Sequence, residues 1–363
     1  MLRLALRGAM FEPILTARLL LRAPTISDLD ALVKRRNDER VARYQDWLMP
    51  FEREEGRQLL TNAAAMDGPT RGQWWMTTVV DRHRPTEDPL GDLGIYVSDD
   101  GRAAEIGYTF AVASQGHGYA TESVEAMLAH LFDEVGVARV SASLHPDNVA
   151  SAMVLERTGF SHEGHSRLSH WRGEGADAFN SDAWYYGLNE ADHRRWQGRP
   201  TDAPDRVELM EITNDNQREV AKLATHKSQE RFVAPVQRSY GDALFPEMFN
   251  GEPVVPWLRA ISADGEVVGF VMVAWRTEHH PNPYLWRLLI DRAHQRRGIA
   301  SRALDLVEDV CRDNGDSAIE VSWAEGRGSP GPFYEARGYV RTGNLIEGET
   351  EAIKPLTAPT RSP

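Results

Sequence analysis

Two short segments of the sequence carry the pattern Gln-x-x-Gly-x-Ala, at residues 115–120 and 295–300. Each lies between a strand-like apolar run and a run with helical periodicity; these runs are 106–112 and 123–132 around the first segment, and 285–290 and 301–311 around the second. A loop that enters a helix leaves backbone N–H groups unpaired at the positive end of the helix dipole, and a glycine lets an anion approach them closely. The pattern predicts a pyrophosphate-binding loop in each half, although a tight turn with a packing glycine would have the same sequence. Other phosphate loops are excluded, because neither copy has Gly-Lys-Ser/Thr and both lack the third glycine of Gly-x-Gly-x-x-Gly.

A second pair of motifs follows the loops at a matched distance. Leu-Glu-Arg-Thr-Gly-Phe begins at residue 155 and Tyr-Glu-Ala-Arg-Gly-Tyr begins at residue 334, so this pair is 179 residues apart and the loops are 180 residues apart. Such a repeat within 363 residues predicts two copies of one domain. Apolar periodicity is lost between residues 187 and 206, where glycine and proline gather. The expected organisation is a first domain at 12–190, a linker at 191–205 and a second domain at 206–356.

Composition limits the partners and the compartment. The chain has 41 Lys and Arg against 54 Asp and Glu, a net charge of −13, so nucleic acid is an unfavourable partner and a cationic or amine-bearing partner is modestly favoured. No apolar stretch is long enough to cross a bilayer, so no membrane association is expected. The single cysteine, Cys311, cannot form an internal disulfide, and a reducing, cytoplasmic location fits. No zinc-binding pattern is present, so no metal is expected. Residues 1–10 are expected to be an irregular leader, and the tail after Leu356 is expected to be disordered.

These motifs together resemble the GNAT superfamily of acetyl-CoA-dependent N-acetyltransferases. The first half resembles the RimJ/RimL-like branch, which acetylates ribosomal-protein N-termini; the matching segments are 104–108, 115–122, 148–151 and 155–160. The second half is similar to the diamine/spermidine-type branch; the matching segments are 232–235, 286–291, 295–300 and 333–339. The resemblance implies an α/β (α+β) fold, with two tandem domains that each contain a mixed, mostly antiparallel sheet flanked by helices.

The resemblance also implies acetyl-CoA as the cosubstrate and an acyltransferase activity. The acceptor would be a primary amine of a small molecule, such as a polyamine or an amine-bearing antibiotic, or a peptide or protein N-terminus. The residues expected to contact CoA are Phe110, Gln115, Gly116, His117, Gly118, Tyr119, Ala120, Thr121 and Asn148 in the first half, and Ile290, Gln295, Arg296, Arg297, Gly298, Ile299, Ala300 and Ser301 in the second. Phe110 and Ile290 mark the strand whose backbone N–H would meet the thioester oxygen. A homodimer is compatible with the sequence, and the alternative function is one catalytic domain with one degenerate domain that binds acyl-CoA for regulation or dimerisation.

Acetyl transfer to an amine requires one group that removes a proton and another that protonates the departing thiolate. In the first half, Glu105 is the candidate base, although a charged residue on a strand also suits a solvated position. The resemblance places Ser151 beside the sulfur, whereas Asn148 and Ser151 would equally suit the start of a helix. Leu155 occupies the position that a tyrosine fills in the second half, so it cannot act as the acid.

In the second half, the resemblance makes Tyr334 the acid that protonates the thiolate, the alternative being an aromatic packing residue. Leu285 stands where Glu105 stands in the first half, so the base is open; the candidates are His279, His280, Glu347, Glu349 and water. Arg327 and Pro330 replace Asn148 and Ser151, which points to an altered CoA site and to the second domain as the weaker copy.

Overall fold

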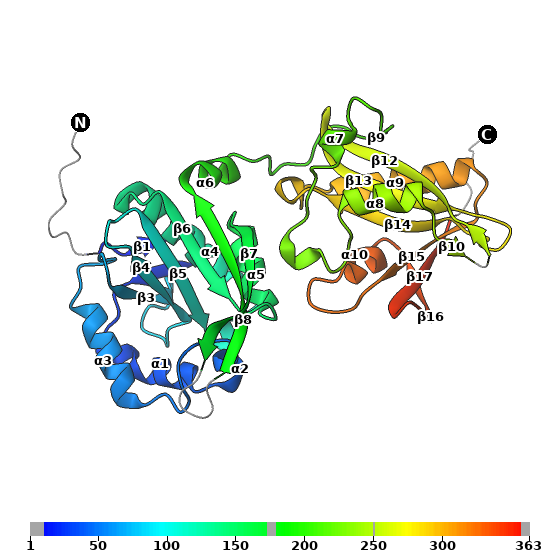
Figure 1. The fold of residues 1–363 in the computed structure, drawn as a ribbon. Helices are drawn as coiled ribbons and strands as arrows, with labels where there is room; N and C mark the ends of the chain where they lie inside the picture. The colour runs from blue at the N-terminus through cyan, green and yellow to red at the C-terminus, as the bar shows by residue number, and fades with distance from the viewer. Residues whose placement is uncertain (1–10, 173–178, 250, 357–363) are drawn as a thin grey trace, which may run out of the picture. The chain divides into compact units, whose positions relative to one another are not determined.

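The computed structural model describes residues 11–172, 179–249 and 251–356, so the expected leader and tail lie outside the described residues. The chain divides into two compact units, Met1–Gln197 and Gly198–Pro363 (Figure 1). Each unit contains its own sheet, its own helices and its own buried core. The expected fold class, two mixed sheets flanked by helices, is confirmed.

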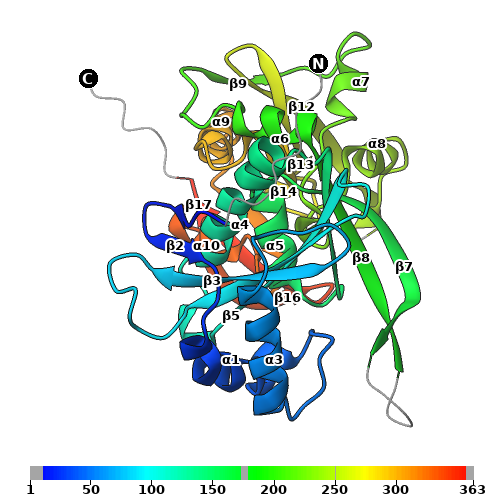
Figure 2. The same cartoon turned by 90° about the vertical axis from the view of Figure 1, so that its left-hand side faces the viewer.

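The N-terminal unit is built on a sheet of eight strands in the order β1-β2-β3-β4-β5-β6-β8-β7. The strands are β1 Ile14–Leu15, β2 Leu19–Arg22, β3 Trp74–Asp81, β4 Gly91–Val97, β5 Ala103–Phe110, β6 Arg139–Leu144, β7 Ser161–Arg172 and β8 Phe179–Asn189. The helices are α1 Leu29–Arg36, α2 Glu39–Ala42, α3 Arg53–Ala64, α4 Tyr119–Ala129, α5 Val149–Arg157 and α6 Glu190–Gln197. Strand β3 is buried from Trp75 to Val80, so this sheet is covered on both faces. Strands β7 and β8 pair antiparallel at one edge of the sheet (Figure 2).

The C-terminal unit repeats this plan with seven strands in the order β16-β17-β15-β14-β13-β12-β9. The strands are β9 Val207–Met210, β12 Val255–Ala263, β13 Glu266–Trp275, β14 Tyr284–Ile290, β15 Ala318–Trp323, β16 Val340–Ile346 and β17 Glu349–Pro355, beside a separate pair, β10 Met248–Phe249 and β11 Glu252–Pro253. The helices are α7 Gln217–Val220, α8 Val236–Leu244, α9 Ile299–Asp313 and α10 Gly331–Ala336.

Alternation along β13 assigns the helices of the C-terminal unit to opposite faces of its sheet. Val271 and Val273 belong to the core that contains the buried residues of α9. Phe270 and Met272 belong to a second core, which contains Val220 of α7 and Val236 of α8. Because successive residues of a strand point to opposite faces, α9 covers one face, and α7 with α8 covers the other.

One parallel pair of strands in each sheet opens into a V. Strands β5 and β6 pair only from Ala103 to Glu105 against Arg139 to Ser141, and β14 and β15 pair only at Tyr284 and Leu285. Beyond these positions the strands separate, and the remaining described strands pair antiparallel with their neighbours. A parallel pair needs a crossover, and here the crossover contains the Gln-x-x-Gly-x-Ala loop followed by α4 or α9. The loop therefore lies beside the open end of the V in both units.

The segment expected to be a linker divides between the two units. Residues 191–197 lie in α6, and Trp196 Nε1 on this helix donates to the carbonyl of Arg157 at 3.1 Å within the N-terminal unit. Residues 198–205 belong to the C-terminal unit, where Arg297 Nε donates to the carbonyl of Asp202 at 2.8 Å and Arg302 donates to that of Asp205 at 2.8 Å.

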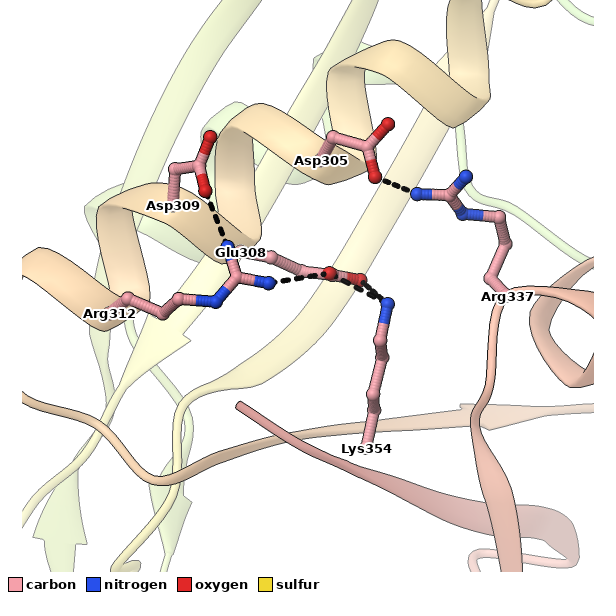
Figure 3. Close-up of polar contacts among 6 residues, drawn as sticks. All are labelled: Asp305, Glu308, Asp309, Arg312, Arg337 and Lys354. Atoms are coloured by element: carbon pink, nitrogen blue, oxygen red, sulfur yellow. Dashed lines mark hydrogen bonds and ion pairs between the residues drawn. The ribbon is translucent and has the colours of Figure 1, made fainter. Parts of the chain in front are cut away.

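Ion pairs anchor helix α9 to the rest of the C-terminal unit (Figure 3). The Glu308 carboxylate, which is 1% exposed, accepts two hydrogen bonds of 2.7 Å from Lys354 Nζ on β17. Arg312 contacts the same carboxylate at 3.4 Å, and Asp305 pairs with Arg337 just beyond α10. This network ties the helix that begins at the second loop to the strand and the turn beside it.

Candidate active sites

The two loops adopt the same backbone conformation. Gly118 precedes α4 with φ of 80° and Gly298 precedes α9 with φ of 75°, both in the left-handed region that a residue with a Cβ rarely adopts. Two residues earlier, Gly116 has φ of 79° and Arg296 has φ of 64°. A Cβ built on Gly298 would meet no atom within 4 Å among the described residues. The shared geometry suits an anion at the first N–H groups of each helix; a Cβ on Gly118 would meet Arg18 Nη2 at 3.4 Å, so a cation stands beside the N-terminal loop.

The glutamine of each motif holds its loop against the preceding strand. Gln115 Nε2 donates to the carbonyl of Phe110 at 3.1 Å, and Gln295 Nε2 donates to that of Ile290 at 3.0 Å. The amides of Gln295 and Gln229 also exchange hydrogen bonds of 2.9 and 3.1 Å. These two glutamine side chains therefore hold each loop against the end of the strand that precedes it.

Arg18 links the N-terminal loop to the first turn of α4 through hydrogen bonds that have no counterpart among those described for the C-terminal loop. Arg18 donates from Nε to Glu122 at 2.7 Å and from Nη1 to the carbonyl of His117 at 2.9 Å, and its guanidinium lies 4.9 Å from the centre of the Tyr119 ring. Burial raises the pKa of Glu122, but hydrogen bonds from Thr16 and Arg18 outweigh that effect, and the net shift is downward. The carboxylate in the first turn of α4 is thus held ionised and paired with a guanidinium beside the loop.

A cavity of about 250 Å³ occupies the V of the N-terminal unit. It brings together Glu105 on β5 with Asn148 and Ser151 at the start of α5, three of the predicted site residues. The predicted loop residues 115–121 are not among the described residues that line it. Asp46, His145 and Asp182 also line it, and the Asp182 carboxylate accepts from the Leu168 N–H at 3.0 Å and lies 2.8 Å from His165 Nε2.

Ser151 in this cavity is hydrogen-bonded to a tyrosine that the sequence reasoning missed. The Tyr108 hydroxyl lies 2.8 Å from Ser151 Oγ and donates to the Ser151 carbonyl at 2.9 Å. Burial raises the pKa of Tyr108, so this hydroxyl keeps its proton at neutral pH. Asn148 caps α5, because its side chain accepts a hydrogen bond from the Ser151 N–H at 3.2 Å. Asn148 and Ser151 therefore begin a helix, as the alternative interpretation of the sequence had it. Tyr108 stands in the matched segment 104–108, and its place on the strand that enters the loop is the signal that could have found it.

A larger cavity, of about 480 Å³, occupies the V of the C-terminal unit. It brings together most of the predicted residues there; those that line it are Ile290, Gln295, Arg296, Gly298, Ile299, Ala300, Ser301 and Tyr334. Arg297 is the exception, because its guanidinium binds the carbonyl of Asp202 and lies 3.1 Å from His294 Nδ1. Pro330 lines the cavity and precedes α10.

Tyr334 is buried at the wall of this cavity. Its ring stacks on Trp323, with ring centres 5.7 Å apart, and is 7% exposed. Within the described chain its hydroxyl makes no hydrogen bond. Burial, followed by repulsion from the negative charges that Tyr284 and Glu349 can carry, raises the pKa of Tyr334. The hydroxyl is therefore protonated at neutral pH and is able to give its proton to a ligand atom in the cavity.

A hydrogen-bonded chain leads away from the same cavity toward one of the candidate bases. Ser322, which lines the cavity, lies 2.6 Å from the Tyr284 hydroxyl and donates to Glu349 Oε2 at 2.5 Å. The other candidates, His279, His280 and Glu347, are not among the described residues of the lining. His280 instead lies 3.1 Å from Glu320. Glu349 is thus the candidate with a path to the cavity, through Ser322.

The described residues contain neither a cluster of metal ligands nor a membrane-spanning helix. In residues 11–172, 179–249 and 251–356, no group of three or more His, Cys, Asp or Glu side chains is arranged to hold a metal ion. Over the same ranges, no helix has the length and apolar character required to span a bilayer.

Comparisons with known proteins match each half of the chain separately. A family model described as an acetyltransferase (GNAT) domain matches residues 18–161, and one described as the acetyltransferase (GNAT) family matches residues 221–339. The uncharacterized N-acetyltransferase YoaA of Bacillus subtilis is 30% identical over 156 residues, which are 43% of this chain and 86% of that protein. The uncharacterized N-acetyltransferase p20 of Bacillus licheniformis is 28% identical over 158 residues, 42% of this chain and 84% of that protein. A solved structure of RimL, a ribosomal L7/L12 α-N-protein acetyltransferase, in complex with coenzyme A is similar with a TM-score of 0.41 and 23% identity, over 49% of this chain and 98% of that one.

Proposed function

The chain belongs to the GNAT acetyltransferase family through both of its halves, and on that premise we propose that each half carries its own acetyl-CoA site and acceptor cavity. The protein is an acetyl-CoA-dependent N-acetyltransferase with an amine as acceptor. Acetyl-CoA supplies an acetyl group activated as a thioester. The observation that carries the proposal is the repeated loop, in which a left-handed glycine opens each helix beside a V between two parallel strands.

In the C-terminal site, the backbone N–H groups at the start of α9 would hold the pyrophosphate, and an N–H near Ile290 would donate to the thioester oxygen. The amine nitrogen forms a bond to the acetyl carbon while the bond from that carbon to sulfur breaks. Tyr334 would donate its proton to the departing sulfur, since this residue lines the cavity, its hydroxyl makes no hydrogen bond within the described chain, and its pKa is raised. Ser322 would accept the proton of the amine and pass its own to Glu349.

In the N-terminal site, Glu105 would accept the proton of the amine, directly or through water. Ser151 would meet the sulfur, and Tyr108, in hydrogen-bond contact with Ser151, would supply the proton that Leu155 cannot. Asp46, Glu105 and Asp182 line this cavity, and no Lys or Arg is among the described residues of its lining. This charge supports a cationic acceptor, such as a polyamine, an amine-bearing antibiotic or a peptide N-terminus with basic neighbours.

One alternative is a single active domain. The cavity of the C-terminal unit encloses both the loop and Tyr334, whereas the loop of the N-terminal unit lies outside the lining of its cavity. If only one unit is active, this difference favours the C-terminal unit. Arg327 and Pro330 in the sequence had instead indicated that the C-terminal unit is the weaker copy. The other domain would then bind acyl-CoA without turnover.

Isothermal titration with acetyl-CoA tests the proposal in the full chain. Gly118→Glu and Gly298→Glu each place a bulky negative side chain at a loop, so each variant should bind one equivalent fewer than the parent. Gly136→Glu and Gly315→Glu are matched controls, because these glycines have φ of 79° and 78°, lie away from the loops and have open space around them. Unchanged stoichiometry in both loop variants would refute the loop assignment. Release of CoA thiol with amines, compared between the two loop variants, then identifies the active domain or domains.

A further inference from the structure

The two units differ in charge at corresponding positions of the V. Glu105 and Leu285 are the last residues of β5 and β14 that pair with the parallel strand, opposite Ser141 and Val321. Two residues further along, where the strands have separated, the N-terminal unit has Gly107 and the C-terminal unit has Arg287. Both residues line their cavities. The C-terminal copy has therefore lost a carboxylate and gained a guanidinium.

The other described residues of the two linings also differ in charge. The described lining of the N-terminal cavity contains Asp46, Glu105, Asp182 and His145 and has no Lys or Arg, although the Asp182 carboxylate lies 2.8 Å from His165 Nε2. The described lining of the C-terminal cavity contains Arg287, Arg296 and His294 and has no Asp or Glu. Arg296 belongs to the loop, so its charge lies at the end expected to hold pyrophosphate. The charge of Arg287 needs a separate explanation.

Arg287 lies on the side of the sheet away from the pyrophosphate helix. Its nearest carboxylate in the described structure is Asp242 on α8, with 3.7 Å between Nη2 and Oδ2, and α8 covers the face opposite α9. The side chain is 19% exposed. The guanidinium therefore lies in the part of the cavity that faces α8, away from the α9 helix expected to hold the pyrophosphate of CoA.

The guanidinium of Arg287 is incompletely satisfied. Nη1 donates to the carbonyl of the adjacent Trp286 at 2.8 Å, and the separation from Asp242 is longer than a hydrogen bond. Nε is buried, and it has no hydrogen-bond partner in the described chain. Burial, opposed by Asp242, lowers the pKa of Arg287, although an arginine stays charged at neutral pH. A cation in this state is stabilised by an anionic group that enters the cavity.

We propose that the C-terminal site acetylates an amine that also carries a carboxylate, as in a free amino acid, and that Arg287 binds this carboxylate. The inference rests on the proposed function of the same site. A diamine, which the resemblance of the second half implied, would bring a second ammonium toward the guanidinium. A carboxylate would form charge-assisted hydrogen bonds there, while the amine end reaches Ser322 and the thioester. The two domains would then use acceptors of opposite charge.

The test uses matched acceptors in the full chain with Gly118→Glu, which removes acetyl-CoA from the N-terminal loop. Short α-, β- and γ-amino acids are each compared with their amide and with the diamine of equal length, and CoA thiol release is measured. The carboxylate form of the best acceptor should exceed its amide in kcat/KM by about tenfold or more, and the diamine by a larger factor. An amide or diamine used as well as the amino acid would overturn the inference while leaving the acetyltransferase function intact. No release with any amine, despite acetyl-CoA binding, would instead overturn the proposed function.

Variants of Arg287 then assign the preference to its side chain. Arg287→Met should reduce the ratio of carboxylate to amide kcat/KM to about one, and Arg287→Lys should keep part of the ratio because the charge remains. Arg296→Met is the matched control; it should raise the KM for acetyl-CoA without changing the acceptor ratio. Equal losses on carboxylate and amide in Arg287→Met would show a structural role and overturn the inference. The acceptor ratio in the unaltered C-terminal site needs no variant at this position, so the inference can be tested even if Arg287→Met fails to fold.

Discussion

The substitution Tyr334→Phe removes a single hydroxyl from the wall of the C-terminal cavity. Because this hydroxyl makes no hydrogen bond within the described chain, its loss breaks no protein contact. The ring keeps its stacking on Trp323 and its place in the core. The free energy of unfolding should therefore change by no more than about 0.5 kcal/mol.

Turnover at the same site should fall far more than stability. A positioned general acid contributes about a hundredfold to ten-thousandfold to a rate. Since a CoA thiolate, with a thiol pKa of about 8.5, is a fair leaving group without a proton, the lower end of about a hundredfold applies. The raised pKa of Tyr334 also fixes the sign of the pH effect: the hydroxyl stays protonated where a free tyrosine, near pH 10, would ionise, so activity should not fall through this group below that pH.

The assay is CoA thiol release in the Gly118→Glu chain, with urea unfolding measured on the same samples. Tyr339→Phe is the control, because the Tyr339 ring lies 5.5 Å from that of Tyr334 but its hydroxyl is buried without a partner and outside the described cavity lining. The control should keep its turnover and be equally or more stable. If Tyr334→Phe kept turnover within about threefold of the parent, or if both variants lost activity equally, the acid role would be refuted.

Two other predictions concern the same unit. Glu349→Gln should lower kcat at least about tenfold, because it removes the proton acceptor at the end of the Ser322 chain. Glu351→Gln is the control, because Glu351 lies on the same strand but is bonded to Thr342 and Asn344; it should leave kcat unchanged, and equal losses in both variants would exclude the relay. Glu308→Gln should lower the free energy of unfolding by about 3 kcal/mol, because Lys354 and Arg312 lose their shared buried partner (Figure 3). Asp309→Asn is the control, because the Asp309 side chain is 64% exposed; in the same urea titration it should change the free energy of unfolding by no more than about 0.5 kcal/mol. Similar losses of stability in both variants would refute the anchoring role.

The sequence predicts the repeated architecture well because the repeated residues are constrained by the backbone. Gly118 and Gly298 occupy left-handed positions, and Gln115 and Gln295 bind the carbonyl that ends the preceding strand. Such demands are local, so they are visible as a short pattern. The correspondence between Leu285 and Glu105 could be predicted for the same reason, because the parallel pairing of strands ends at Glu105 in the first unit and at Leu285 in the second.

The residues that the sequence reasoning missed depend on contacts between distant segments. Tyr108 belongs to the site because it is hydrogen-bonded to Ser151, and Ser322 belongs to it because it is hydrogen-bonded to Tyr284 and Glu349. The pairing of α6 with the N-terminal unit likewise depends on Trp196 reaching Arg157, which apolar periodicity does not encode. Arg287 did leave a local signal, as the one charged residue within an otherwise apolar strand, but the cavity and Asp242 are needed to interpret it.

The net charge of −13 favoured cationic acceptors, but the charge of a cavity is set by the few residues that line it. Surface charges are screened over about 10 Å of salt solution, whereas a half-buried guanidinium acts on a ligand at short range and in a lower dielectric. The carboxylates of the N-terminal cavity agree with the net charge, and Arg287 opposes it. Because both cavities form between equivalent strands of one fold, a substitution at positions such as Glu105 and Leu285 changes the charge of the acceptor cavity without disturbing the loop that holds the cosubstrate. Duplication of such a domain would therefore allow the acceptors to diverge while the acetyl donor stays the same.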